Sequence, residues 1–157
     1  MKKGDSKKKS GFTIIEVALV IAIAGLIFLM VFIALPQLQR QQRDSRRRDD
    51  ILSFLETVKK YQTNNRGTLP DNWNTFRAQY LQNFVDPDGT EYILQDAECQ
   101  SGKDSRCDYN EPSAMDHTLY IFTKATCNGQ EVWGSSNPRN VAVLYRLEGS
   151  GLYCNNT

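Results

Sequence analysis

A single carboxylate borders a long apolar segment near the N-terminus, and its surroundings require a chemical explanation. Glu16 directly precedes Val17 to Leu35, a run of nineteen residues without a charged or strongly polar side chain. An ionised carboxylate inside an apolar helix costs about 2.5 to 3.5 kcal/mol even on insertion-based scales, so Glu16 needs a partner. The stretch from Phe12 to Gln39 contains no Lys, Arg or His that would provide one.

Two interpretations of Glu16 remain open from the residues alone. In the first, cleavage of the peptide bond after Gly11 gives Phe12 an α-amino group, which pairs with Glu16 on a neighbouring copy of the chain. In the second, Glu16 is an ordinary residue of a helix start, where the helix dipole stabilises it among the lipid headgroups.

The apolar run has the length of a membrane-spanning helix. At 1.5 Å per residue it reaches about 28 Å, close to the hydrocarbon thickness of a bilayer. A cleaved secretory signal has a shorter apolar region with the cleavage site after it. A buried core helix is the other alternative, but the 91 residues after Arg66 are too few to surround a helix that is apolar on every side. The lysine-rich leader MKKGDSKKKSG favours a cytoplasmic N-terminus, although arginines also follow the span.

The run from Gly11 to Glu16, GFTIIE, closely resembles the class III signal of type IV prepilins, with its lysine-rich leader before it and the apolar helix after it. The resemblance implies that a prepilin peptidase cuts after Gly11 and that Phe12 becomes an N-methylated N-terminus. It also implies that Glu16 recognises the Phe12 amine of an adjacent subunit during assembly. Gly25 matches a helix-loosening glycine of many pilins. Pro36 lies about one turn later than their helix-breaking proline.

The function implied by this resemblance is that of a structural subunit of a type IV pilus. Such a subunit is a single-pass precursor in the cytoplasmic membrane with its C-terminus outside, and it becomes a homopolymer on the cell surface. Its partners are prepilin peptidase, an assembly ATPase and a membrane platform protein. A pseudopilin of a type II secretion or DNA-uptake machine is the alternative within the class. A membrane-anchored extracellular binding module that never polymerises is the alternative from another class.

The chain beyond the span predicts one long helix, from about Thr13 to Asn65, followed by a head. Apolar residues spaced by three and four mark one helical face from Ile51 to Tyr61, and the sequence from Asn64 to Gly67 provides a stop. The predicted divisions are a leader (1–11), a transmembrane or filament-core helix (12–36), its amphipathic second half (37–66) and the head (67–157).

The head predicts an α+β, pilin-like fold in which a small antiparallel sheet packs against the amphipathic half-helix. We expect a short helix over 75–83 and strands over 91–95, 118–126, 141–147 and 152–154, the last two joined as a hairpin. The expected core consists of Phe54, Leu55, Val58, Leu119, Ile121, Val141 and Val143.

The charge pattern favours neither nucleic acid nor acidic substrates. The net charge is +1, and 157 residues exclude a large multidomain enzyme. Five arginines follow the span, but three aspartates interleave with them at helical spacing, which favours a solvated or intersubunit face over a nucleic-acid patch. These residues are Arg40, Arg43, Arg46, Arg47 and Arg48 with Asp44, Asp49 and Asp50.

Metal binding and catalysis find little support in the sequence. Two acidic sets are calcium candidates, but neither completes the spacing of a calcium loop, so turn chemistry is the favoured interpretation. His117 is the single histidine and no nucleophile motif is present, so we expect no enzyme activity and no cofactor. The two sets are Asp86, Asp88 and Glu91, and Asp96, Glu98, Asp104, Asp108 and Glu111.

Four cysteines fall in the part expected outside the cell, which predicts two disulfides rather than a zinc site, since no CxxC pair is present. Three connectivities are possible. We favour Cys99 with Cys107, which closes a polar loop, and Cys127 with Cys154, which ties the last strand to the sheet. Loop entropy gives them roughly 2.5 and 3.5 kcal/mol of stabilisation, respectively.

Overall fold

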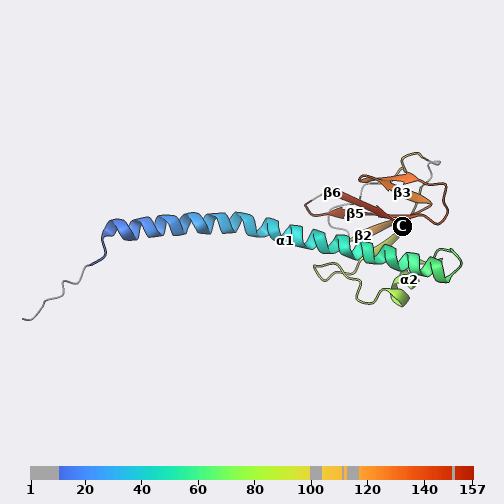
Figure 1. Ribbon diagram of the computed structural model, residues 1–157, viewed down its shortest axis with the longest axis horizontal. Coiled ribbons are helices and arrows are strands. Elements are labelled where there is room, and N and C mark those ends of the chain that lie inside the picture. Colours follow the sequence, from blue (N-terminus) through green and yellow to red (C-terminus); the bar gives the residue numbers. More distant parts are fainter. Residues whose placement is uncertain (1–10, 100–103, 111, 113–116, 150) are drawn as a thin grey trace, which may run out of the picture. The chain divides into compact units, whose positions relative to one another are not determined.

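The long helix α1 spans Ile14–Asn64 in the computed structural model, which confirms the helix predicted from Thr13 to Asn65. The structure describes residues 11–99, 104–110, 112, 117–149 and 151–157 (Figure 1). The leader apart from Gly11 therefore lies outside the described residues, as does Glu111 of the second acidic set.

Gly25 and Pro36, which the resemblance marks as a helix-loosening glycine and a helix-breaking proline, both lie inside α1 in the isolated chain. A glycine lowers helix propensity by about 1 kcal/mol, and a proline costs about 3 kcal/mol and removes one hydrogen bond. Neither loss ends a helix that is continued by many neighbours on both sides.

The chain divides into two units, residues 1–38 and residues 39–157. In the described part of the first unit, α1 is long and apolar enough to cross a membrane, and none of its most apolar window is buried within the chain. Large apolar side chains are exposed throughout this part of the chain, from Phe12 to Leu38.

The second unit holds the rest of α1, which stops where the sequence predicts. The backbone N–H of Gly67 donates to the carbonyl of Gln62 at 2.7 Å. Arg66 and Gly67 have φ values of 57° and 85°, and this left-handed conformation at the end of a helix favours glycine. A short helix, α2 (Trp73–Tyr80), follows; it begins two residues before the predicted one because Asn72 caps the backbone N–H of Thr75.

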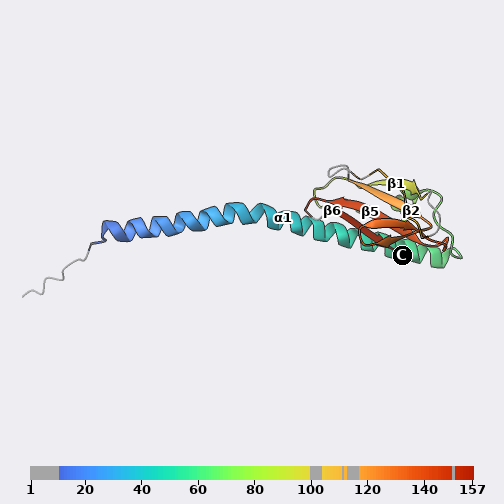
Figure 2. The ribbon, with the colours of Figure 1, turned by 90° about the horizontal axis from the view of Figure 1, so that it is seen from above.

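The main sheet has four strands in the order β1 (Ile93–Glu98), β2 (Thr118–Thr123), β5 (Val141–Leu147) and β6 (Gly151–Asn156) (Figure 2). β2, β5 and β6 pair antiparallel, and β5 and β6 form the predicted hairpin. β1 pairs parallel to β2, however, with Ile93 opposite Thr118. The predicted antiparallel sheet is therefore mixed at its β1 edge, where the chain between β1 and β2 is long enough for the crossover that parallel strands need.

The predicted strand over 118–126 is two strands. The chain turns at Lys124, whose φ is 56°, and β3 (Ala125–Asn128) then pairs with β4 (Glu131–Gly134) as a separate hairpin. Sequence analysis missed β4, since four residues are too short for an alternating pattern to stand out.

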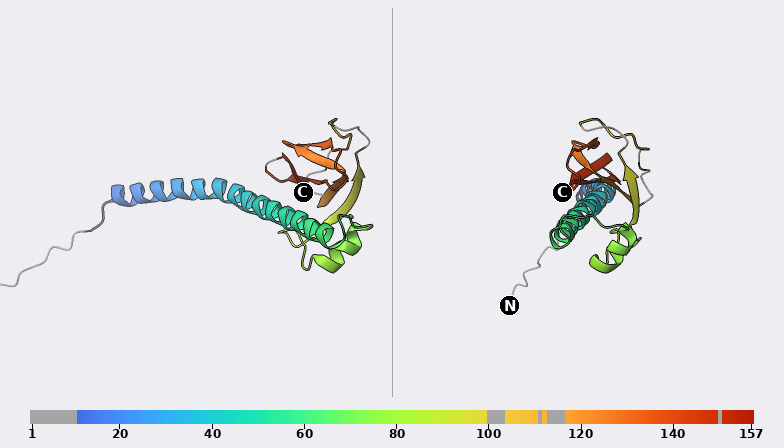
Figure 3. Two further views of the ribbon diagram at one scale, coloured as in Figure 1. Left: turned by 45° about the vertical axis from the view of Figure 1, so that its right-hand side comes forward. Right: turned by 90° about the vertical axis from the view of Figure 1, so that its right-hand side faces the viewer.

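Two apolar clusters hold this second unit together. In the larger, Phe54 and Val58 of α1 pack with Leu119 and Ile121 of β2, and every predicted core residue is buried there. Phe122 belongs to the other face of the sheet. Figures 1 and 3 show the strands on one side of the second half of α1 and α2 on another. The two disulfides, Cys99–Cys107 and Cys127–Cys154, have the favoured connectivity.

Candidate functional site

The carboxylate of Glu16 closes the start of α1 in the isolated chain. Glu16 Oε2 accepts hydrogen bonds from the backbone N–H and from the hydroxyl of Thr13, each at 3.1 Å. Thr13-Ile14-Ile15-Glu16 therefore has the arrangement of a capping box, in which the fourth residue reaches back to the first. Phe12 is exposed to solvent over 88% of its surface.

Among the residues that the structure describes, Glu16 has neutral donors but no cation. The helix-start interpretation therefore has a concrete form in the single chain. The amine interpretation concerns a group that exists only after cleavage, at the residue directly before Thr13. The two are compatible, because within the described residues the other oxygen, Oε1, accepts no hydrogen bond.

The second unit contains a buried charge cluster that sequence analysis did not identify. The Arg47 guanidinium, on α1, grips the Asp86 carboxylate with two hydrogen bonds, Nε to Oδ2 at 2.6 Å and Nη2 to Oδ1 at 2.8 Å. Arg47 is 2% exposed and Asp86 is 1% exposed. Tyr145 also donates its hydroxyl to Asp86 Oδ2, at 3.1 Å. Such bidentate pairing is the strongest form of the arginine–carboxylate interaction.

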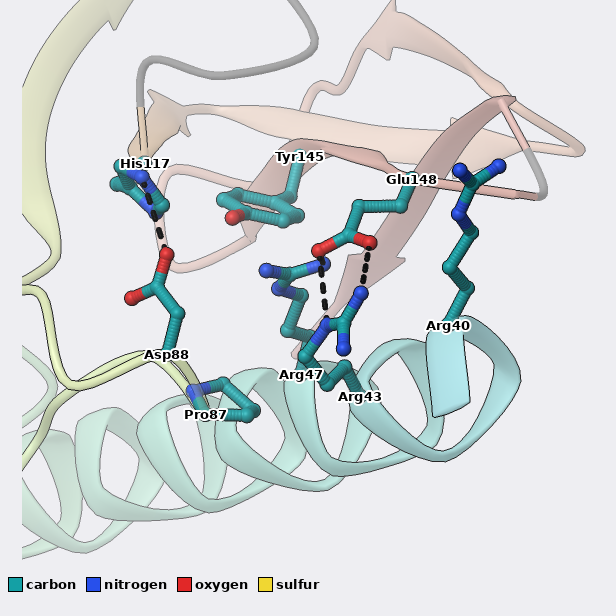
Figure 4. Close-up of a pocket in the computed structure, with 8 residues that line it drawn as sticks. All are labelled: Arg40, Arg43, Arg47, Pro87, Asp88, His117, Tyr145 and Glu148. Atoms are coloured by element: carbon teal, nitrogen blue, oxygen red, sulfur yellow. Dashed lines mark hydrogen bonds and ion pairs between the residues drawn. The ribbon is translucent and has the colours of Figure 1, made fainter. Parts of the chain in front are cut away.

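The same cluster reaches the connection between β5 and β6. Glu148 contacts Arg47 Nη1 at 2.8 Å and Arg43 Nη2 at 2.6 Å (Figure 4). The buried Asp44 carboxylate accepts the backbone N–H groups of Glu148 and Gly149 at 3.0 and 2.9 Å. One turn and a half of α1 therefore holds both the Asp86 turn and the β5–β6 connection in place.

This cluster corrects the prediction of a solvated or intersubunit face only for Asp44 and Arg47 of the arginine-rich segment. Asp44 and Arg47 are buried and Arg43 is half-buried, whereas Arg46 and Arg48 are exposed. A signal for this was present: positions 44 and 47 continue, at helical spacing, the stripe that carries Ile51 and Phe54.

Two carboxylates of the cluster, those of Glu148 and Asp86, have lowered pKa values that favour their charged forms. The hydrogen bond from Arg43, ahead of the opposing effect of burial and with help from Arg47, lowers the pKa of Glu148 to about 2. Burial raises the pKa of Asp86, but hydrogen bonds from Arg47, from the Asp88 N–H and from Tyr145 outweigh it and hold that pKa below its usual range.

We expect acid to destabilise the second unit as these carboxylates take up protons. A carboxylate with a depressed pKa contributes stability above its unfolded pKa, and that contribution is lost as the pH falls through the folded value. For Glu148 the window runs from its ordinary value of 4.5 down to about 2. Asp50 works in the opposite direction, because burial raises its pKa.

The measurement is thermal unfolding of the detergent-solubilised chain followed by circular dichroism between pH 7 and pH 2. The melting temperature should fall most steeply below pH 4.5, and Glu148→Gln should flatten part of that fall. Glu56→Gln, at an exposed position of α1, is the matched control. Equal acid sensitivity in the Glu148→Gln variant and the original chain would contradict the assignment.

The structure does not assemble the predicted calcium candidates. Glu91 pairs with Arg77 at 2.8 Å instead of joining Asp86 and Asp88. His117 takes its place, with Nε2 3.4 Å from Asp88 Oδ2. In the described stretches the only set of potential metal ligands brought together is Asp86, Asp88 and His117, and both oxygens of Asp86 are already occupied by donors. The Asp86–Gly89 segment is a turn, as predicted, closed by the Gly89 N–H on the Asp86 carbonyl at 2.8 Å.

An open cleft of about 720 Å³ lies over this cluster, lined by the residues drawn in Figure 4. Arg40 stands at its edge, apart from the ion pairs (Figure 4). Within the cleft, Arg43 and Arg47 both pair with Glu148, so these charges join α1 to the β5–β6 connection.

Comparison with protein families places the N-terminal segment. Residues 6–32 match the family model described as the prokaryotic N-terminal methylation motif. This motif is the class III signal peptide of type IV pilins and pseudopilins. It supports a precursor of the pilin-like or pseudopilin kind, with an apolar helix that fits membrane anchoring, and it implies processing by prepilin peptidase and assembly into type IV pilus-like machinery. Neither the curated proteins nor the solved structures gave a match.

Proposed function

We propose that this chain is a structural subunit of a type IV pilus filament. It is made as a membrane-anchored prepilin, cleaved after Gly11, methylated at Phe12 and polymerised through the first half of α1. The methylation motif at residues 6–32, carried on a helix whose apolar side chains are uncovered, is the observation that supports this most directly.

Outside the membrane, the exposed apolar side chains of this helix must be buried against other apolar groups, and polymerisation meets this requirement. The second unit has an apolar core of its own, and the large apolar side chains from Phe12 to Leu38 are exposed. When the helix leaves the bilayer, lipid contacts must be replaced, and the helices of other copies replace them. An assembly ATPase and a membrane platform protein drive the extraction. The head then lies on the filament surface, outside the cell, and needs no cofactor and performs no reaction.

A pseudopilin of a secretion or DNA-uptake machine has the same N-terminal motif and is the second candidate. Both polymerise, so filament length separates them. A long fibre that shearing releases from the cell surface supports the pilus subunit, whereas a short rod confined to the cell envelope supports the pseudopilin. A monomeric membrane-anchored binding module would form neither.

The decisive experiment is intact mass measurement with N-terminal sequencing of material sheared from cells. We expect a chain that starts at Phe12, carries one methyl group on its amine and contains two disulfides. Gly11→Leu is the control, because a side chain at the cleavage position should leave the leader attached and the sheared fraction empty. Recovery of the original chain with its leader, dispersed as single molecules, would overturn the proposal.

A further inference from the structure

Charge in the second unit is segregated along the sequence. Residues 40–66, which cover the second half of α1 and the two residues after it, contain eight Lys and Arg against four Asp and Glu. Residues 86–116 contain nine Asp and Glu against two Lys and Arg. The net charge of +1 therefore conceals a basic segment and an acidic segment, and the buried cluster around Arg47 neutralises only part of each.

Arginines at a spacing of three form a ridge on α1, the basic patch of Arg40, Arg43 and Arg46. Arg43 is held by Glu148 and keeps a third of its side chain exposed. Arg40 and Arg46 are exposed, and neither forms an ion pair with any residue that the structure describes.

Three exposed carboxylates form an acidic patch at the C-terminal end of β1: Asp96, Glu98 and Asp108. Asp96 and Glu98 alternate along β1, which is the edge strand of the sheet. Asp108 joins them through the Cys99–Cys107 disulfide, whose Cα atoms are 4.9 Å apart. Cys99 directly follows Glu98, and Cys107 directly precedes Asp108, so the disulfide brings the two acidic residues together. Within the described part of the chain none of the three has an ion-pair partner.

The two patches lie at opposite ends of the sheet. The basic patch pairs through Arg43 with Glu148, which directly follows β5. It also lies next to Arg47, which binds Asp86. Asp86 Oδ2 is 3.7 Å from Nδ1 of His117, the residue before β2, so the basic patch lies at the end of the sheet where β5 finishes and β2 begins. The acidic patch lies where Glu98 pairs with Thr123 at the end of β2. Five strand steps separate these ends by roughly 17 Å, beyond the Debye length of about 8 Å at physiological salt. The patches of one head therefore do not neutralise each other.

We propose that the basic patch of one copy docks onto the acidic patch of a second copy of this chain. The inference rests on the proposed function, since only a polymer repeats the contact. In a helical filament, one surface of a subunit meets a different surface of the next, so charges at opposite ends of a head become neighbours. The carboxylates also keep the exposed edge of β1 from pairing with other strands, a role that any charged side chain can fill. The docking role requires negative charge.

The test is a charge swap in the full chain expressed in its host. Arg40→Glu with Arg46→Glu, and separately Asp96→Lys with Glu98→Lys, should each lower the yield of sheared filaments roughly tenfold, the effect of one contact of ordinary coupling strength. The chain that combines all four substitutions should recover most of that yield. Lys59→Glu with Lys60→Glu on the same helix makes the same change in net charge outside the patch and should leave the yield intact.

Membrane levels of the processed precursor, with both disulfides formed, verify folding of each variant. Normal filament yield in both single-patch variants, or a combined variant no better than either, would overturn the docking and leave the pilus assignment standing. A loss confined to the β1 variant and not rescued by the swap would also overturn the docking, because the arginines would then be dispensable and the introduced lysines still protect the strand edge. Absence of filaments from the original chain would instead refute the proposed function.

Discussion

Replacing Arg47 by alanine should lower the free energy of unfolding of the second unit by about 3 to 5 kcal/mol, the usual cost of removing one partner from a buried ion pair. The substitution leaves Asp86 and Asp44 buried without their cation, and both are at most 3% exposed. Glu148 also loses a contact of 2.8 Å, so the β5–β6 connection should loosen from α1.

Chemical denaturation followed by tryptophan fluorescence measures this effect, because Trp73 packs on Phe54 in the core, with ring centroids 5.8 Å apart. Arg46→Ala, next in sequence but exposed, is the matched control and should change stability by no more than about 0.5 kcal/mol. Arg47→Met combined with Asp86→Asn should recover part of the loss, since both charges are then gone. An Arg47→Ala chain as stable as the Arg46→Ala chain would show that the cluster does not join α1 to the head.

Replacing Glu16 should strongly reduce filament assembly while leaving membrane insertion intact. The expected loss is about 10- to 100-fold in filament yield, which corresponds to one hydrogen-bonded charge pair between subunits. Insertion should not suffer, because removing a carboxylate makes the apolar helix cheaper to place in lipid.

Two substitutions separate the pairing role of Glu16 from its capping role. Glu16→Gln keeps an acceptor for the Thr13 N–H, since glutamine also completes a capping box, but it carries no charge. Glu16→Ala removes both. If pairing with the Phe12 amine matters, the two variants should assemble equally poorly, as judged by sheared filament yield at equal precursor levels. Normal assembly of the Glu16→Gln chain would reduce Glu16 to a helix cap.

Much of the fold followed from local patterns. The end of α1 was predictable because Gly67 has to adopt a left-handed conformation that glycine favours, and the Asp86–Gly89 turn because proline and glycine restrict the backbone locally. The core residues of α1 were predictable because their spacing of three and four places them on one face. The N-terminal motif was readable for the same reason: its residues are consecutive and its chemistry needs no partner from elsewhere in the chain.

The tertiary structure decided which distant groups meet. Arg47 binds Asp86, 39 positions away. Glu91 pairs with Arg77 and does not join the nearby aspartates in a ligand set. The parallel pairing of β1 likewise depends on a crossover whose path no short pattern specifies. The periodicity of apolar side chains predicts which of them are buried. A charged side chain is buried only where an opposite charge lies beside it, and folding of the whole head brings the two together.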